Sequence, residues 1–394
     1  MPRRWTACLI ALAATSAFTT GRAADPAPDD AFALVVRPPW SQQAPPKPEE
    51  LAAARRVIDA QAASDPKSAR WVFAQGQAAR LEAHEGKAGE AKRKEALERF
   101  EKAASLEPGN ADYQFWLGSA AFDRADDVSL FSKMSLASTG RKAFEKAIAI
   151  DSNHVAARVG MAQFFLQAPA IAGGSIDKAR DAGNALVALP DRRGEFQGRM
   201  VLAQIAEHDE KWDEMSRQLV AAETASGDGA DPVGALRMHA WMLLNRKKDA
   251  QAALPVLDRY AKIAKPDDLT AIFLQAEANR QLGRCADALP KYDQVLAKFD
   301  GARGSRWGAA VCREQLGQKE AARRDYEEFA RRFPDDDHTK DAKAAGAGAS
   351  RARSGSGQAL HRRPCRASTG RGRCWRSRWS WVYLPADFVR SRRG

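Results

Sequence analysis

A pattern that recurs about seven times along the chain sets the strongest limit on its fold. In each copy, a small residue in the middle of one helical segment is followed by Ala, a large apolar residue and Ala at spacings i, i+4 and i+7 in the next segment. These spacings place the three residues on one face of a helix. One pair of helices cannot bury its own apolar face, so successive pairs must stack into a continuous core. We therefore predict an all-α chain of stacked helix pairs.

The first and last copies show the pattern most clearly. The second helix of the first copy carries Ala96, Phe100, Ala103 and Pro108, and that of the last carries Ala322, Tyr326, Phe329 and Pro334. The fifth copy is the weakest, because Arg259 stands where Ala is expected. The copies start near residues 67, 111, 155, 196, 233, 269 and 303. The first three are long, and their extra residues, 85–95, 126–138 and 167–175, are predicted to be loops or helix extensions.

These copies resemble the tetratricopeptide repeat. In that family, small residues let neighbouring helices approach closely, an aromatic residue fills the space between repeats, and proline ends the second helix. The resemblance implies a right-handed superhelical solenoid of about seven helix pairs. It also implies a protein that binds other proteins rather than an enzyme.

The family geometry implies which residues would contact a partner. Positions 2, 5, 9 and 12 of the first helix of each repeat would line a groove. The aromatic, arginine and methionine residues at such positions are Phe115, Phe122, Met200, Arg237, Trp241, Phe273, Arg280 and Trp307. Large aromatic and arginine side chains dominate binding energy at interfaces. The alternative is that several of these residues are core, because the first helix also packs against its own partner helix.

The N-terminal region reads as a secretory signal followed by a linker and a capping helix. Arg3 and Arg4 precede an uncharged stretch, 5–20, that is too short to span a bilayer, and cleavage is predicted after Ala23. We expect a signal peptide over residues 1–23, a Pro-rich linker over 24–47 and a capping helix over 48–66. The mature protein would be periplasmic or secreted, with no transmembrane span.

The repeat array is expected to cover residues 67–345, and the composition changes abruptly after it. Residues 346–394 contain twelve Arg, no Lys and one acid, and they show no helical periodicity. We interpret this as a disordered tail, produced by a frameshift in the gene. The alternatives are a genuine basic arm that binds polyanions or membrane lipid, and a linker to a further segment.

The net charge of +12 does not describe the repeat array. Residues 346–394 contribute +11 and residues 1–23 contribute +3, which leaves −2 for residues 24–345. This near-neutral body does not favour nucleic-acid binding.

Two cysteines, Cys285 and Cys312, lie in the array. The repeat alignment puts them on neighbouring antiparallel helices, so they could form a disulfide in an oxidising compartment. The alternative is a pair of buried free thiols.

The sequence shows no constellation of catalytic or metal-binding residues. The six histidines form no ligand pair at helical spacing. Two Ser-x-x-Lys matches lack the Lys-Thr-Gly element that penicillin-binding enzymes need. The glycine-rich segment 168–178 lacks the spacing of a phosphate-binding loop, and Ser175 is expected to cap a helix. We predict no catalytic residue, no metal site and no cofactor.

The sequence therefore predicts a non-catalytic scaffold in the bacterial cell envelope that binds a protein or peptide in its groove. Residues 303–343 resemble repeats of bacterial envelope assembly lipoproteins. Alternatives are a regulatory or recruiting module of an envelope enzyme complex, and polyanion or membrane-surface binding through the basic tail. The pattern identifies neither the partner nor the oligomeric state.

Overall fold

The structure is a computed structural model that describes residues 25–39, 44–84, 86–125, 127–227 and 230–346. Within these ranges every regular element is a helix, apart from one isolated β-bridge between Gly227 and Ala230. The predicted all-α fold is confirmed. The expected signal peptide and, from residue 347 onward, the expected tail lie outside the described residues.

The first of two compact units consists of residues up to 108, without 39–42. Its helices are α1 (Pro28–Val35), α2 (Pro48–Ser64), α3 (Ala69–Glu82) and α4 (Lys87–Leu106). The structure corrects the linker predicted over residues 24–47, because α1 lies within it. Pro28 at the first position and acidic residues in the first turn favour a helix start. Val35 of α1 is buried with Ile58 of α2 and Ala74 of α3, so packing supplies the remaining stability.

The second unit begins at Gly109 and contains the other helices. They are α5 (Ala111–Ala125), α6 (Leu130–Ile150), α7 (Val155–Gln167), α8 (Ile176–Val187), α9 (Arg192–His208), α10 (Trp212–Ala225), α11 (Val233–Met242), α12 (Ala250–Ile263), α13 (Leu269–Gln281), α14 (Cys285–Lys298), α15 (Arg303–Gln315), α16 (Lys319–Arg332) and α17 (Thr339–Gly346). Two short elements, the 3-10 turn η1 (Ala170–Ala172) and the π-helical turn η2 (Leu243–Lys247), follow α7 and α11.

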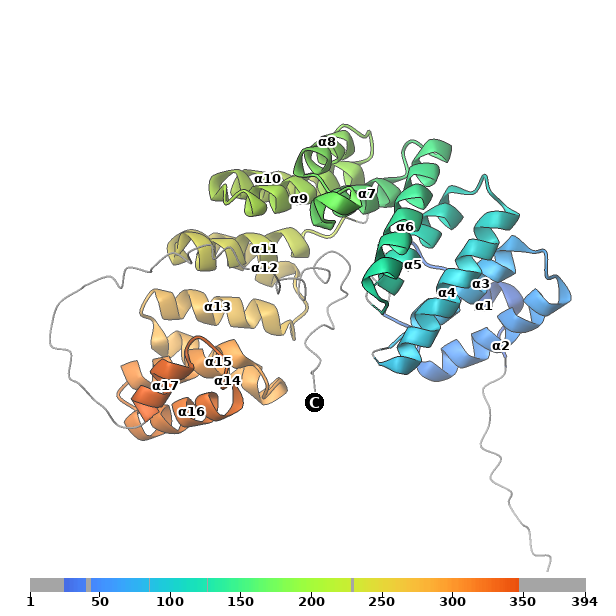
Figure 1. The fold of residues 1–394 in the computed structure, drawn as a ribbon. Coiled ribbons are helices and arrows are strands. Elements are labelled where there is room, and N and C mark those ends of the chain that lie inside the picture. The colour runs from blue at the N-terminus through green and yellow to red at the C-terminus, as the bar shows by residue number, and fades with distance from the viewer. Residues whose placement is uncertain (1–24, 40–43, 85, 126, 228–229, 347–394) are drawn as a thin grey trace, which may run out of the picture. The chain divides into compact units, whose positions relative to one another are not determined.

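Consecutive helices form pairs, from α3 with α4 to α15 with α16, as the repeat pattern predicts. Figure 1 shows the later pairs of the second unit as successive layers of helices. We call the first helix of each pair helix A and the second helix B. The long early copies extend helix B: α4 has 20 residues and α6 has 21. The third insertion instead forms η1.

Small residues set the distance between helices in this stack. The ring of Phe144 on α6 lies against Gly118 of α5 and Gly160 of α7, where an added Cβ would come within 2.6 Å of ring atoms. Gly308 of α15 packs against Tyr292 of α14 in the same way, at 2.3 Å. The aromatic residue of helix B thus fills the space that glycine leaves on the neighbouring helices A.

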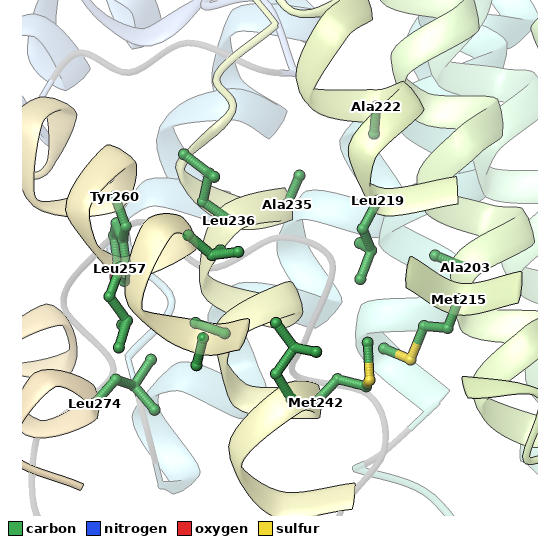
Figure 2. Close-up of a cluster of buried hydrophobic side chains, with 14 of the residues drawn as sticks. Ala203, Met215, Leu219, Ala222, Ala235, Leu236, Met242, Leu257, Tyr260 and Leu274 are labelled. Atoms are coloured by element: carbon green, nitrogen blue, oxygen red, sulfur yellow. The ribbon is translucent and has the colours of Figure 1, made fainter. Parts of the chain in front are cut away.

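The largest core cluster joins five helices, α9 to α13 (Figure 2). Leu219 of α10, Met242 of α11, Leu257 of α12 and Leu274 of α13 are each at most 2% exposed. Burial of one such side chain contributes about 1.5–3 kcal/mol to stability. This continuous core holds the helices A of three successive repeats in fixed positions.

The weak fifth repeat has a structural explanation. Arg259 of α12 is exposed and forms two hydrogen bonds to Glu223 of α10, at 2.6 and 3.1 Å. A two-point contact between a guanidinium and a carboxylate is among the stronger ion pairs. The residue that departs from the repeat pattern therefore links neighbouring helices B through a salt bridge.

Candidate functional site

The predicted groove residues on α5 belong to the core. Phe115 is 3% exposed, and its ring stacks 5.8 Å from that of Phe144. Phe122 lies 5.6 Å from the same ring and 5.8 Å from Phe164 of α7. The prediction of Phe115 as a groove residue is corrected, because this face of helix A packs against its own helix B. Phe122 is half-buried and packs mainly within the same aromatic cluster.

Four predicted residues on α9, α11 and α13 remain partly accessible. Met200, Trp241 and Phe273 are half-buried and pack against the α9–α13 core. Arg237 of α11 is also half-buried. An aromatic or thioether side chain held on one side by a rigid core can contact a partner with little loss of conformational entropy.

Arg280 is held within its own helix pair. Its Nε donates to Glu277 Oε2 at 3.1 Å, and Glu277 also accepts hydrogen bonds from Gln281 at 2.9 Å and from the Tyr292 hydroxyl at 2.8 Å. Burial alone would raise the pKa of Glu277, but the hydrogen bond and charge of Arg280 and the other donors outweigh it and lower the pKa. The Glu277 carboxylate is therefore ionised, and Arg280 is its counterion.

Trp307 of α15 is the last of the predicted residues. Its ring lies 5.5 Å from Tyr326 and 5.4 Å from Phe329 of α16, and 4.5 Å from the imidazole of His338, which directly precedes α17. Trp307 is half-buried, so the segment that leads into α17 covers part of it.

Sequence reasoning missed the aromatic and basic cluster around Arg246. The guanidinium of Arg246, on η2, lies over two indole rings, 5.4 Å from Trp212 of α10 and 5.3 Å from Trp241 of α11. Arg246 is exposed, whereas both tryptophans are half-buried. Two features of the sequence could have indicated this cluster. Trp212 lies at the start of a helix B, soon after the end of a predicted helix A, and Arg246 begins a run of basic residues, Arg-Lys-Lys.

A surface depression lies beside this cluster, between η2, the start of α12 and the end of α13. Its volume is about 700 Å³. The side chains that line it include Lys247, Lys248, Arg280 and Gln281. The amide of Gln281 donates to the Leu244 carbonyl at 3.2 Å, which ties α13 to η2. The acidic side chain of Asp249 also lines the depression, and Lys247 and Arg280 are paired with Asp213 and Glu277.

The half-buried Ser216 of α10 and the buried His239 of α11 form a polar pair, with Oγ and Nε2 2.8 Å apart. Burial lowers the pKa of His239, with a smaller contribution from the positive charge of Arg259. No carboxylate of the described residues hydrogen-bonds the His239 ring, so the pair lacks the orienting group of a catalytic triad. In the same described ranges, no three His, Cys, Asp or Glu side chains are grouped as metal ligands.

The two cysteines of the array are adjacent. Cys285 at the start of α14 and Cys312 on α15 form a disulfide, with their Cα atoms 5.0 Å apart.

The glycine-rich segment 168–178 has the expected local structure as well, because the Ser175 hydroxyl accepts a hydrogen bond from the Lys178 amide at the start of α8. None of the helices in the described ranges combines the length and apolar character needed to cross a bilayer.

Comparison with known proteins gives fold relatives but no curated one, since no curated protein matches the sequence. YrrB, described as a TPR protein with an unusual peptide-binding site, is 18% identical over 63% of this chain and 99% of its own, with a TM-score of 0.32. A tetratricopeptide repeat protein from Parabacteroides merdae is 11% identical over 67% of this chain and 92% of its own, with a TM-score of 0.42. The apo quorum sensor NprR from B. thuringiensis is 11% identical over 72% and 83%, with a TM-score of 0.46.

The family itself is identified by sequence. The tetratricopeptide repeat model matches residues 273–337, which cover most of α13 and all of α14, α15 and α16. These helices include the last copy, one of the two with the clearest pattern, and the same pairing of helices continues upstream. The chain therefore contains tetratricopeptide repeats, which the family model matches over residues 273–337.

Proposed function

We propose that this protein is a non-catalytic scaffold of the bacterial cell envelope that binds a protein or peptide on the helix-A side of α9, α11, α13 and α15. The observation that carries the proposal is the series of half-buried side chains on these helices: Met200, Trp241, Phe273 and Trp307. Each is supported by core on one side. Tetratricopeptide repeats serve protein interaction, and these side chains supply anchors of the kind that interfaces favour.

A segment bound along successive helices A would meet one such anchor in each repeat. Because the helices are fixed by shared core, the anchors are ordered before binding, which reduces the entropy lost on association. A surface of this kind suits an extended or helical segment that contacts several repeats in turn.

Peptide selection tests this proposal. Peptides selected by display on the full chain should lose about tenfold or more in affinity for Trp241→Ala, since truncation of a central aromatic anchor costs more than 1 kcal/mol. Val220→Ala is the matched control, because Val220 lies on helix B of the fourth repeat and is 46% exposed. It should change affinity less than about twofold.

A folding control and a second variant distinguish loss of binding from loss of structure. Circular dichroism must show that Trp241→Ala keeps its helical content, and Met200→Ala provides a second variant with a smaller effect on the core. If selected peptides bind both helix-A variants as tightly as wild type, the partner does not use this face and the proposal is wrong.

The envelope location is tested separately. The full-length chain expressed in a Gram-negative host with a C-terminal epitope should be shortened by the signal peptide and become protease-sensitive in spheroplasts. A full-length, protease-protected product would contradict export.

A further inference from the structure

The guanidinium of Arg246 has no acidic partner among the residues that the structure describes. It lies over the rings of Trp212 and Trp241, and each cation–π contact restrains the side chain. Arg246 is exposed and forms no ion pair with any described residue. The N–H donors of a guanidinium can bind a carboxylate at two points.

The acidic residues around Arg246 already have other partners. Asp213 pairs with Lys247 at 2.7 Å, and Glu214 pairs with Arg217 at 2.5 Å. Asp249 accepts a hydrogen bond from the Ala252 amide as the N-cap of α12. Among the residues that the structure describes, the guanidinium of Arg246 therefore has no acidic partner.

The adjacent depression is lined by both basic and acidic side chains. Lys247, Lys248 and Arg280 lie on its rim together with Asp249, and Lys247 and Arg280 are paired with Asp213 and Glu277. Lys248 adopts a left-handed backbone conformation, with φ of 56°, which glycine would adopt without strain. Lysine occupies this position, two residues after Arg246, although the left-handed conformation costs free energy for a residue other than glycine.

The geometry points to a carboxylate-binding site at Arg246, bordered by Trp212 and Trp241, that recognises an acidic peptide segment. This inference rests on the proposed function and specifies its partner: an acidic residue would bind the guanidinium of Arg246, and the flanking residues of the segment would lie along the adjacent depression. Peptide carboxylates fit better than a uniform polyanion, because one guanidinium beside two indole rings combines a single charged contact with apolar surface.

Site-resolved photo-crosslinking tests the inference in the full chain. The probe is an N-acetylated, C-amidated hexaglutamate peptide with a diazirine group, and adducts are located by mass spectrometry. Locating them matters because residues 346–394 carry +11 and will also attract the probe. We expect adducts on the segments that contain Trp212 and residues 241–248.

Three variants define the expected result. Arg246→Gln should lower the adduct yield on these segments about tenfold, as expected for loss of a charge-assisted contact. Arg246→Lys keeps the charge but not the planar fork, and should lower the yield about threefold. Arg217→Gln makes the same change in charge on α10, at a side chain that is 68% exposed, and should change the yield less than about twofold.

Several outcomes would overturn the inference. These are adducts confined to residues 346–394, an equal loss of yield with Arg217→Gln, and complete displacement of the probe by inorganic polyphosphate at equal charge concentration. The last outcome would identify a general polyanion site. If display-selected peptides still require Trp241 while hexaglutamate gives no adduct at Arg246, this inference fails and the proposed function stands.

Discussion

The hydroxyl of Tyr292 on α14 donates a hydrogen bond to Glu277 on α13, with 2.8 Å between Oη and Oε2. The next repeat contains a similar contact, from the Tyr326 hydroxyl on α16 to Glu314 on α15, at 2.7 Å. Burial, together with the nearby carboxylate, raises the pKa of both tyrosines. The aromatic residue of helix B thus fills the space between repeats, and its hydroxyl stabilises a carboxylate on helix A by a hydrogen bond.

Tyr292→Phe should lower the free energy of unfolding by about 1–2 kcal/mol, because Glu277 loses a donor but keeps Arg280 and Gln281. Urea unfolding followed by circular dichroism measures the loss. In a Glu277→Gln background the same substitution should cost less, because the acceptor is then uncharged, and equal costs in the two backgrounds would show that the charge of Glu277 does not strengthen the hydrogen bond.

Gly308→Ala should destabilise the protein by about 1–3 kcal/mol through overpacking. The added Cβ would lie 2.3 Å from Tyr292 Cζ, so the ring or α15 must shift. Gly234→Ala on α11 is the matched control, since a Cβ added there would have no atom within 4 Å. It should be neutral or stabilising by up to about 1 kcal/mol. Thermal unfolding of both variants distinguishes a steric effect from a general effect of replacing glycine.

The helix pairs could be predicted from sequence because their signal is local and repeated. The spacing of Ala96, Phe100 and Ala103 reports one buried helix face, and seven copies reinforce one another. The helix α1 could not be predicted in this way. It has 8 residues and no repeat pattern, and it depends on burial of Val35 against α2 and α3. Short helices owe most of their stability to such tertiary contacts.

The candidate site was only partly accessible to sequence reasoning. A repeat position identifies a face of helix A, but that face meets both its own helix B and the solvent. Phe115 and Trp241 were assigned by the same position rule, yet Phe115 is buried and Trp241 is half-buried. The contact of Arg246 with Trp212 and Trp241 depends on the π-helical turn, and no pattern in the sequence specified that turn.

The Cys285–Cys312 disulfide should raise stability by roughly 3 kcal/mol, which the chain-entropy model gives for the 27-residue separation. The double variant Cys285→Ala, Cys312→Ala should therefore unfold at lower urea concentration than the oxidised wild type. The double variant should also be insensitive to dithiothreitol, whereas the wild type should lose stability when it is reduced. Labelling of both thiols by maleimide in protein prepared without reductant would contradict the disulfide.

His239 should make stability depend on pH near neutrality. Burial, together with the positive charge of Arg259, lowers the pKa of His239 below its ordinary value of 6.5. The unfolded chain therefore binds a proton at higher pH than the folded protein does. The contribution of His239 to stability is fully present above the pKa that this histidine has in the unfolded chain. The contribution decreases as the pH falls through that value, until His239 of the folded protein is also protonated.

The substitution His239→Gln keeps a partner for Ser216 but cannot be protonated. Urea unfolding at a series of pH values between about 5 and 8 should show a smaller decrease in stability toward low pH for this variant than for wild type. His84→Gln, at an exposed position in the first unit, serves as the control and should retain the wild-type slope. Equal slopes for wild type and His239→Gln would show that protonation of His239 does not limit stability in this range. The Ser216 contact would then be compatible with a charged imidazole, which donates to the hydroxyl instead of accepting from it.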